Sequence, residues 1–191
     1  MHDEGILLSM HVTIKKYRDM ESVRNTSGLA DFLYERLSER YIAPVKTSAQ
    51  KNGFAMMACA CLLIETIQCF RHGWKSSNGA GPSEAVFQEF FDNEHRFDQF
   101  RNCATDFHSC VRCGVLHQGE TKGGWRITRK KSAPVFDTQS KTIQATKFLN
   151  RLDASLRDYC RTLKRLPWRD DLWKNFRRKM NSIIANCEAQ P

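Results

Sequence analysis

The stretch from which the fold and the function are best argued is residues 111–121, VRCGVLHQGET. It places Arg112 and His117 five positions apart, with Gly114 between them and Gly119 just after them. An aromatic segment, FDQFRNCATDFHSC, leads into it, and a basic, turn-rich segment, KGGWRITRKK, follows it. We interpret the remainder of the chain as a scaffold that buries one side of this motif and places charges around it.

Length, composition and charge set the broad class of the protein. With 191 residues, 41% hydrophobic and 27% charged, the chain is expected to form a single domain, 1–191, with a substantial core. Lys and Arg number 30 against 21 Asp and Glu, which gives a formal charge of +9. Such a surplus favours an anionic partner, namely nucleic acid, a membrane surface or an acidic protein, although a merely soluble basic protein would carry it too.

The eight cysteines indicate a reduced, cytoplasmic protein rather than a disulfide framework. The N-terminal residues lack the basic segment and the cleavage site of a secretory signal. Several cysteines fall on apolar helical faces, where free Cys behaves as a small hydrophobe. The longest uncharged apolar run, residues 54–64, has 11 residues, which is too short to span a bilayer. It predicts a buried helix, and we expect no membrane partner.

Apolar periodicity predicts a mainly helical chain. Residues 1–24 are uncertain, with only a weak strand-like alternation at residues 10–14. Beyond them, helices are expected at residues 26–41, 51–73, 83–100, 102–118, 142–164 and 170–187. The first of these should be capped by Thr26 or Ser27 and end before Pro44. The Phe-rich residues of the third are expected to supply a large aromatic packing surface.

A change of period after the motif predicts a basic insertion at residues 122–141. Trp125 and Ile127, and then Val135 and Phe136, resemble two short strands on either side of a basic turn, RKKSAP. A β-hairpin or an extended flap would fit this pattern. The expected architecture is therefore a mainly α, helical bundle with a small β-hairpin or extended insertion after the motif helix.

Arg112 and His117 are a workable pair for cleaving RNA without a metal ion. A His, with an unperturbed pKa of about 6.5, can take or supply the protons when the ribose 2′-hydroxyl attacks the adjacent phosphate. A permanently charged Arg can hold the phosphate in the transition state. The two positions point about 140° apart on an ideal helix, so Gly114 is expected to distort the helix or Gly119 to end it. At a helix end the dipole favours a protonated His117.

An Arg, four to six residues and then a His on a late helix of a helical bundle resemble the signature of the HEPN superfamily. The wider string VRCGVLHQGET, after a Phe-rich segment and before GWRI, is similar to HEPN-type segments, and the resemblance covers residues 50–120. The chain departs from active members at two places. Cys113 stands where Asn, Asp or His is usual, and Gly119 stands where toxin-type members often carry Tyr.

The resemblance implies a metal-independent endoribonuclease that cleaves RNA by 2′-OH transesterification without a cofactor, with Arg112 as phosphate ligand and His117 as acid or base. It implies a homodimer in which the two motifs line one cleft. It also implies a role in phage defence or in a toxin–antitoxin system, with an antitoxin or another regulatory protein as partner. Cys113 keeps an alternative open, namely a catalytically silent HEPN-like module that binds RNA or a nucleotide or docks a partner protein.

Glu65 and a basic stretch supply the other candidate site residues. Glu65 lies on an otherwise apolar helix and needs a partner there. It either pairs with an Arg or His across the core or orients the motif residues, and Cys113 is a second supporting candidate. Lys and Arg side chains interleaved with a Trp suit single-stranded RNA. The candidate RNA-binding residues are Lys122, Trp125, Arg126, Arg129, Lys130 and Lys131.

A zinc site is the competing hypothesis for the motif. Cys110, Cys113 and His117 form the pattern C-x2-C-x3-H, to which His108 or Cys103 could add a fourth ligand. Such a site would occupy His117 and exclude the nuclease hypothesis. We prefer the nuclease hypothesis, which requires no metal.

Overall fold

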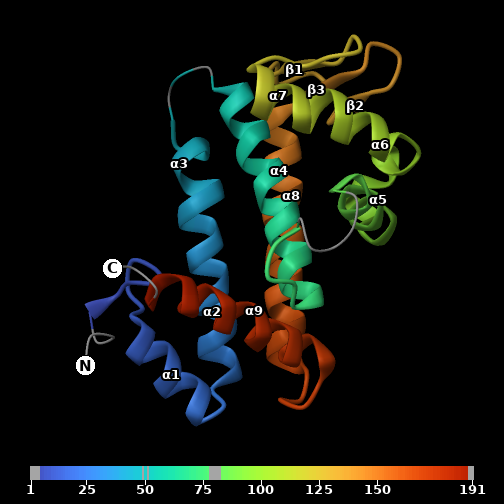
Figure 1. Cartoon of the computed structure of the whole chain (residues 1–191). Coiled ribbons are helices and arrows are strands. Elements are labelled where there is room, and N and C mark those ends of the chain that lie inside the picture. The colour runs from blue at the N-terminus through green and yellow to red at the C-terminus, as the bar shows by residue number, and fades with distance from the viewer. Residues whose placement is uncertain (1–4, 49, 51, 78–82, 189–191) are drawn as a thin grey trace.

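The computed structural model describes residues 5–48, 50, 52–77 and 83–188, and it shows a mainly helical protein with a small three-stranded sheet in this part of the chain (Figure 1). The α-helices are α1 (Ile14–Ser22), α2 (Thr26–Leu37), α3 (Ala43–Lys46), α4 (Gly53–His72), α5 (Ser83–Asn93), α6 (Ala104–Asp106), α7 (Cys113–Gln118), α8 (Ala145–Arg165) and α9 (Asp171–Glu188). Helical segments of other pitch are a π turn at Ser38–Ile42, a 3-10 segment at His95–Cys103 and a second π turn at Phe107–Arg112. The strands are β1 (Arg126–Thr128), β2 (Phe136–Asp137) and β3 (Thr142–Gln144). The mainly α character expected from the sequence is confirmed.

Helix α4 lies at the centre of the bundle and packs against α5, α8 and α9 (Figure 1). By length and composition it could cross a membrane, but 61% of its most apolar window is buried inside the protein. Packing therefore accounts for its apolar sequence. The uncharged run 54–64 covers only part of this helix, which continues to His72. Burial, rather than length, supports the prediction of a core helix.

Helices α2, α8 and α9 complete the bundle. α8 buries an apolar stripe against α2 and α4, as its periodicity predicts. Its N-terminus is capped by Gln144, whose side chain accepts the backbone N–H of Lys147 at 2.6 Å. Pro167 follows its end, as predicted, and α9 then crosses one end of the bundle (Figure 1). The indole of Trp173 on α9 donates to the Leu163 carbonyl at 2.9 Å and ties the two helices together.

A cluster of Phe rings joins α5, the segment after it and α8. Phe91 stacks on Phe100 with ring centroids 5.3 Å apart, and Phe107 stacks on Phe148 at 5.6 Å. All four side chains are fully buried. This is the aromatic packing surface expected from the sequence, and it fixes the segment that leads into the motif.

The basic insertion contributes to a sheet with the strand order β1–β3–β2. β1 pairs with β3 in parallel, and β2 pairs with β3 antiparallel. The predicted hairpin between the strands on either side of RKKSAP is therefore wrong, because those strands form the two edges of the sheet. The strand between them, β3, comes from residues predicted to begin a helix. Ile143 is fully buried there, so packing overrides the helical periodicity.

Two details of the second helix differ from the predictions. Asn25, rather than Thr26 or Ser27, caps α2, and its side chain accepts a backbone N–H of the first turn at 2.9 Å. The helical path does not stop before Pro44, because the π turn Ser38–Ile42 leads directly into α3. Pro44 lies in the first turn of α3, where its missing N–H needs no partner.

The N-terminal region contains a helix rather than the weak strand suggested by residues 10–14. Oγ1 of Thr13 accepts the N–H of Lys16 at 3.2 Å and caps α1. Within the described part of this region, extended pairing is confined to one bridge between Leu7 and Thr13. The alternation suggested a strand because Val12 and Ile14 are both buried. Ile14, however, already belongs to the helix.

Candidate functional site

The motif lies where the helix changes pitch. Residues Phe107–Arg112 form a π turn, in which the N–H of Cys113 bonds to the carbonyl of His108, five residues earlier. α7 then ends at Gly119, whose backbone is left-handed, with φ +68°. The sequence predicted this end correctly. It did not predict the π turn, which replaces the single helix expected at 102–118. Such turns are frequent at functional sites.

The side chains of Arg112 and His117 meet. Nη1 of Arg112 lies 3.2 Å from Nε2 of His117, although positions five apart diverge on an ideal helix. The length of the Arg side chain closes the gap. Because a guanidinium can only donate, Nε2 of His117 must accept, which places the imidazole proton on Nδ1.

Glu65 anchors Arg112 from the central helix. Its Oε1 accepts from Nε of Arg112 at 2.8 Å, and the two side chains are only 10% and 16% exposed, respectively. Ser77 Oγ donates to the other carboxylate oxygen at 3.1 Å. Burial alone would lower the pKa of Arg112, but the hydrogen bond to Glu65 and its negative charge outweigh burial, so this pKa is raised. Glu65 was expected to pair with an Arg or His or to orient the motif residues, and its partner is Arg112 of the motif itself. The pair leaves the far end of the guanidinium facing His117.

A second histidine, His108, lies beside the motif. Its Nε2 is 2.9 Å from Oγ of Ser83 and 3.7 Å from Sγ of Cys113. Burial lowers the pKa of His108, and the charge of Arg112 lowers it further, so this ring stays neutral near pH 7. Sequence reasoning gave His108 no role beyond a fourth zinc ligand. The available signal was that His108 and Cys113 have the same spacing as Arg112 and His117.

Gly114 lets the chain after α7 fold back onto the motif. A Cβ at this position would lie 2.4 Å from the carbonyl oxygen of Glu120 and 3.2 Å from Cα of Thr121. We expect Gly114→Ala to push this backbone away and to lower the free energy of unfolding by about 1–3 kcal/mol, as measured by chemical denaturation. Cleavage of any substrate that depends on the motif should also be slower in Gly114→Ala.

The matched control is Gly119→Ala. No atom lies within 4 Å of a Cβ placed there among the described residues, but the φ of +68° strains any other residue. The expected loss of stability is about 1–2 kcal/mol from backbone strain alone, with the motif geometry kept. If Gly119→Ala disturbed the motif more than Gly114→Ala did, the close approach at Gly114 would not be the feature that requires glycine.

The basic insertion is only partly available to a ligand. Trp125 is 4% exposed, and its ring stacks on that of Phe136 with centroids 5.1 Å apart. Its predicted role as a base-stacking residue is therefore wrong, because the ring completes the core beneath the sheet. The predicted RNA contacts that do lie on the surface are Lys122, Arg126, Lys130 and Lys131.

The side chain of Arg129 makes hydrogen bonds within the fold. Its Nη1 donates to the carbonyl of Gln50 at 2.6 Å and to Oδ1 of Asn52 at 2.9 Å. Its Nε donates to Oγ1 of Thr146 at 3.4 Å. These contacts join β1 to the beginnings of α4 and α8. Nε and Nη1 of Arg129 are therefore engaged within the fold, which favours a structural role for this residue over the predicted RNA contact.

The cysteines do not assemble a metal site in the described part of the chain. No group of three or more His, Cys, Asp or Glu side chains is placed there to hold a metal ion. Cys110 lies against Ser109, with Sγ and Oγ 3.6 Å apart, and Cys113 lies against His108. All eight cysteines are free thiols. The residues of the C-x2-C-x3-H pattern are therefore not gathered into one cluster in this arrangement.

Comparison of the chain with protein-family models, with curated proteins and with solved structures gives no match. A carboxylate, a guanidinium and an imidazole lie in line, from buried Glu65 through half-buried Arg112 to exposed His117. Such a line can hold an anionic group at the guanidinium and move a proton at the imidazole.

Proposed function

We propose that this protein is a metal-independent endoribonuclease of the HEPN type that cleaves RNA with Arg112 and His117. The observation that carries the proposal is their contact, 3.2 Å between Nη1 and Nε2, anchored from the core by Glu65. The spacing of the two residues in the sequence is common. The contact makes them one site with a fixed positive charge beside a proton acceptor, which is what RNA transesterification requires.

The chemistry divides between the two side chains. As the guanidinium of Arg112 turns from Nε2 of His117 to the phosphate, Nε2 accepts the proton of the ribose 2′-hydroxyl while the 2′-oxygen attacks phosphorus. The guanidinium of Arg112 stays charged and stabilises the negative charge that builds on the phosphate oxygens. The bond to the 5′-oxygen breaks, and that oxygen takes up a proton. The products are a 2′,3′-cyclic phosphate and a 5′-hydroxyl.

A homodimer would supply a second imidazole to protonate the leaving oxygen. Helix α4 supports this part of the proposal, because it exposes Phe54 and Leu62, each by 38%. Phe54, Ala58 and Leu62 are spaced four residues apart, so they form one apolar stripe along the helix. Glu65 follows Leu62 by one turn. An apolar stripe this close to the motif suits the self-complementary interface of a two-fold dimer.

The test of the proposed activity is cleavage of total RNA and of tRNA by the purified protein in excess EDTA. We expect cleavage that survives chelation. The products should accept a 5′-phosphate from polynucleotide kinase without prior phosphatase treatment, because the reaction leaves a 5′-hydroxyl. Products that already carry a 5′-phosphate, or activity that requires an added divalent metal, would contradict the mechanism.

Leu62→Glu is expected to dissociate the dimer and to lower cleavage by about tenfold or more, because it places a charge in the apolar stripe. Light scattering and cleavage rates, compared at one protein concentration, measure both effects. Val23→Glu is the matched control, since Val23 is 73% exposed at the end of α1 and should tolerate the charge. A monomeric wild type, or a Leu62→Glu protein that stays dimeric, would exclude this interface.

A catalytically silent module of the same type is the second candidate, and Cys113 favours it. Sγ of Cys113 lies 4.0 Å from Nη1 of Arg112, so a thiol stands beside the guanidinium where active members usually carry a polar side chain. Binding of RNA without cleavage would select this candidate. Both candidates place the protein in the cytoplasm with RNA as partner. Co-purification from cells would test for an antitoxin or regulatory protein and for a role in phage defence.

A further inference from the structure

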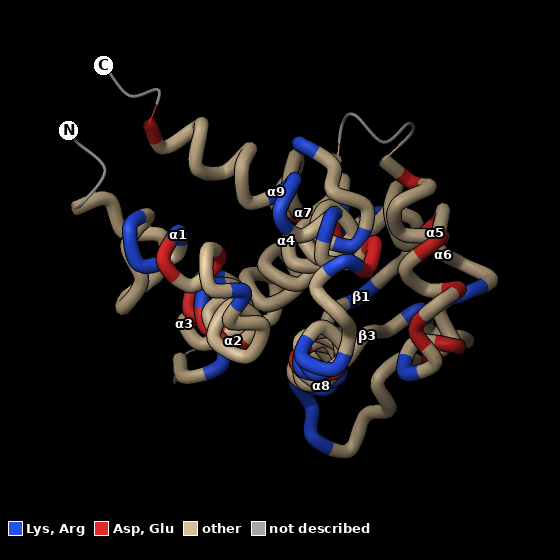
Figure 2. The backbone as a smooth tube through the Cα atoms, turned by 90° about the horizontal axis from the view of Figure 1, so that it is seen from below, with Lys and Arg blue, Asp and Glu red and all other residues tan. Residues whose placement is uncertain are grey.

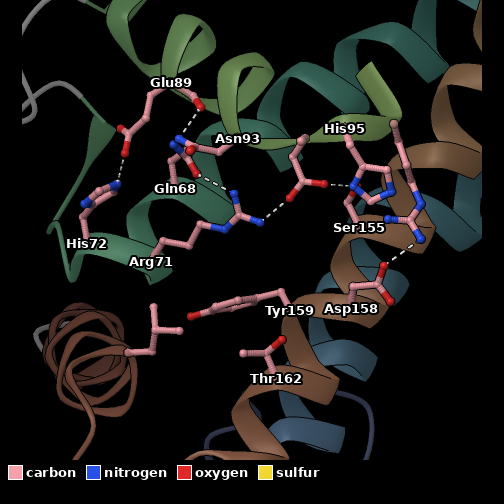
Figure 3. Close-up of a pocket in the computed structure, with 13 residues that line it drawn as sticks. Gln68, Arg71, His72, Glu89, Asn93, His95, Ser155, Asp158, Tyr159 and Thr162 are labelled. Atoms are coloured by element: carbon pink, nitrogen blue, oxygen red, sulfur yellow. Dashed lines mark hydrogen bonds and ion pairs between the residues drawn. The ribbon is translucent and has the colours of Figure 1, made fainter. Parts of the chain in front are cut away.

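A second concave site lies one turn beyond Glu65 along α4. Gln68 of α4, Glu89 of α5, Tyr159 of α8 and Leu172 of α9 surround a hollow of about 440 Å³ (Figure 3). The motif residues do not line it. Its volume falls within the range of small-molecule pockets. The hollow therefore needs an explanation separate from the motif.

Two buried polar atoms of this hollow have no hydrogen-bond partner among the described residues. They are Nε2 of Gln68 and Oη of Tyr159. Gln68 is fully buried and Tyr159 is 5% exposed, and Figure 3 shows the Tyr159 ring extending across the hollow with its hydroxyl at the tip. Burial raises the pKa of Tyr159, so its hydroxyl keeps its proton and can donate. Unpaired buried donors are costly and uncommon, and two in one hollow indicate a ligand that carries acceptors.

The charges of the hollow disfavour an anionic ligand. Two of its carboxylates are matched with cations in the ion pairs Arg71–Glu94 and Arg96–Asp158, and the third, Glu89, contacts the ring of His72. The wall formed by α5 is acidic, since residues 83–106 hold six Asp and Glu against two Lys and Arg, and Figure 2 shows these acidic residues gathered on α5 and the segment after it. A phosphate would meet three carboxylates and find no uncommitted cation among these pairs. An uncharged ligand is favoured.

The geometry points to a nucleobase as the ligand of this hollow. The carbonyl and ring-nitrogen acceptors on the edge of a base would satisfy Nε2 of Gln68 and Oη of Tyr159. Its N–H groups would donate to Glu89, whose Oε1 lies 2.7 Å from His72 and whose carboxylate accepts further hydrogen bonds. The Tyr159 ring and Leu172 supply apolar contact. A free nucleoside and an unpaired base of an RNA strand both present this chemistry.

Arg71 contacts the side chains that carry the two unpaired atoms. Its Nη1 bonds Oε1 of Gln68 at 3.3 Å, its guanidinium carbon lies 5.7 Å from the centroid of the Tyr159 ring, and Nη2 pairs with Glu94. Neither unpaired atom contacts solvent. The edge of a base therefore reaches them when the Arg71 side chain moves aside while it keeps its ion pair with Glu94.

The first test is binding of adenosine, guanosine, cytidine and uridine to the wild type and to Tyr159→Phe by calorimetry and ligand-observed NMR. We expect at least one nucleoside to bind, and Tyr159→Phe to weaken it by about five- to tenfold, the value of one hydrogen bond. The thermal midpoint of Tyr159→Phe should stay the same or rise, because the variant loses only an unpaired hydroxyl. Tyr41→Phe, at a half-buried Tyr outside the hollow, should leave binding unchanged.

A second arm separates the two sources of the base. Single-stranded RNA and the same strand with abasic positions are titrated into His117→Ala protein, with and without Tyr159→Phe, and followed by fluorescence anisotropy. If Tyr159→Phe weakens the binding of nucleosides, the ligand is a free nucleoside. If it weakens only the binding of the intact strand, the ligand is an unpaired base of RNA. If Tyr159→Phe weakens the binding of neither ligand, the proposal is overturned. Both arms record binding, so an inactive protein in the cleavage assay would not affect the result.

Discussion

Replacing His117 by alanine is expected to remove measurable RNA cleavage while the protein stays folded. Nε2 of His117 takes the proton of the 2′-hydroxyl in the proposed mechanism, and loss of a general base lowers a rate by about 10²–10⁴-fold. The side chain is exposed in the last turn of α7. Its removal leaves the core packing intact, so the thermal midpoint should change by less than about 2 °C.

Cleavage rates in EDTA, measured beside thermal unfolding, check this expectation. His11→Ala is the matched control, because His11 is also exposed but lies outside the motif, with Glu35 3.7 Å from its ring. It should cleave like the wild type. Unchanged cleavage by His117→Ala would remove His117 from the mechanism and would indicate a contaminating nuclease or a different site.

The longest helices, α4, α8 and α9, were predictable because they carry local signals. Gly73 and Gly119 end α4 and α7 in left-handed conformations, and the stripes of α8 and α9 fix their buried faces. The two edge strands of the sheet were also located, but strands of two or three residues have no period that fixes their pairing, and β3 was predicted as the start of a helix. Trp125 was misread for a related reason. An aromatic among Lys and Arg has the same sequence pattern whether its ring faces solvent or, as here, stacks on Phe136.

The candidate site was predictable in its members but not in its geometry. Glu65 stood out as a carboxylate on an apolar helix, and burial of that charge required a partner. The π turn at Phe107–Arg112 had no marker, because no Gly or Pro lies within it. It is set by tertiary packing that buries both Phe107 and Val111. His108 was overlooked because its neighbours are brought to it by that same turn.

Glu65→Ala is expected to be the most destabilising single change at the site. It leaves the charge of Arg112, whose side chain is 16% exposed, without its partner. Removing one member of a buried ion pair costs about 3–5 kcal/mol, and the remaining exposure lowers this to about 2–4 kcal/mol here. For a chain of this length the thermal midpoint should fall by roughly 5–15 °C. Cleavage should fall as well, because the guanidinium is no longer held toward His117.

A double-mutant cycle separates the pair from the packing around it. The wild type, Glu65→Gln, Arg112→Gln and the double variant are unfolded with denaturant, and a coupled pair loses less in the double variant than the sum of the single losses. Asp98→Asn, which removes an exposed pair with Arg101, should cost less than about 1 kcal/mol. Additive losses at Glu65 and Arg112 would mean that the two are held independently. Strong coupling, together with lost cleavage by the folded Glu65→Gln protein, would mean that the core carboxylate serves to aim the guanidinium at the reacting phosphate.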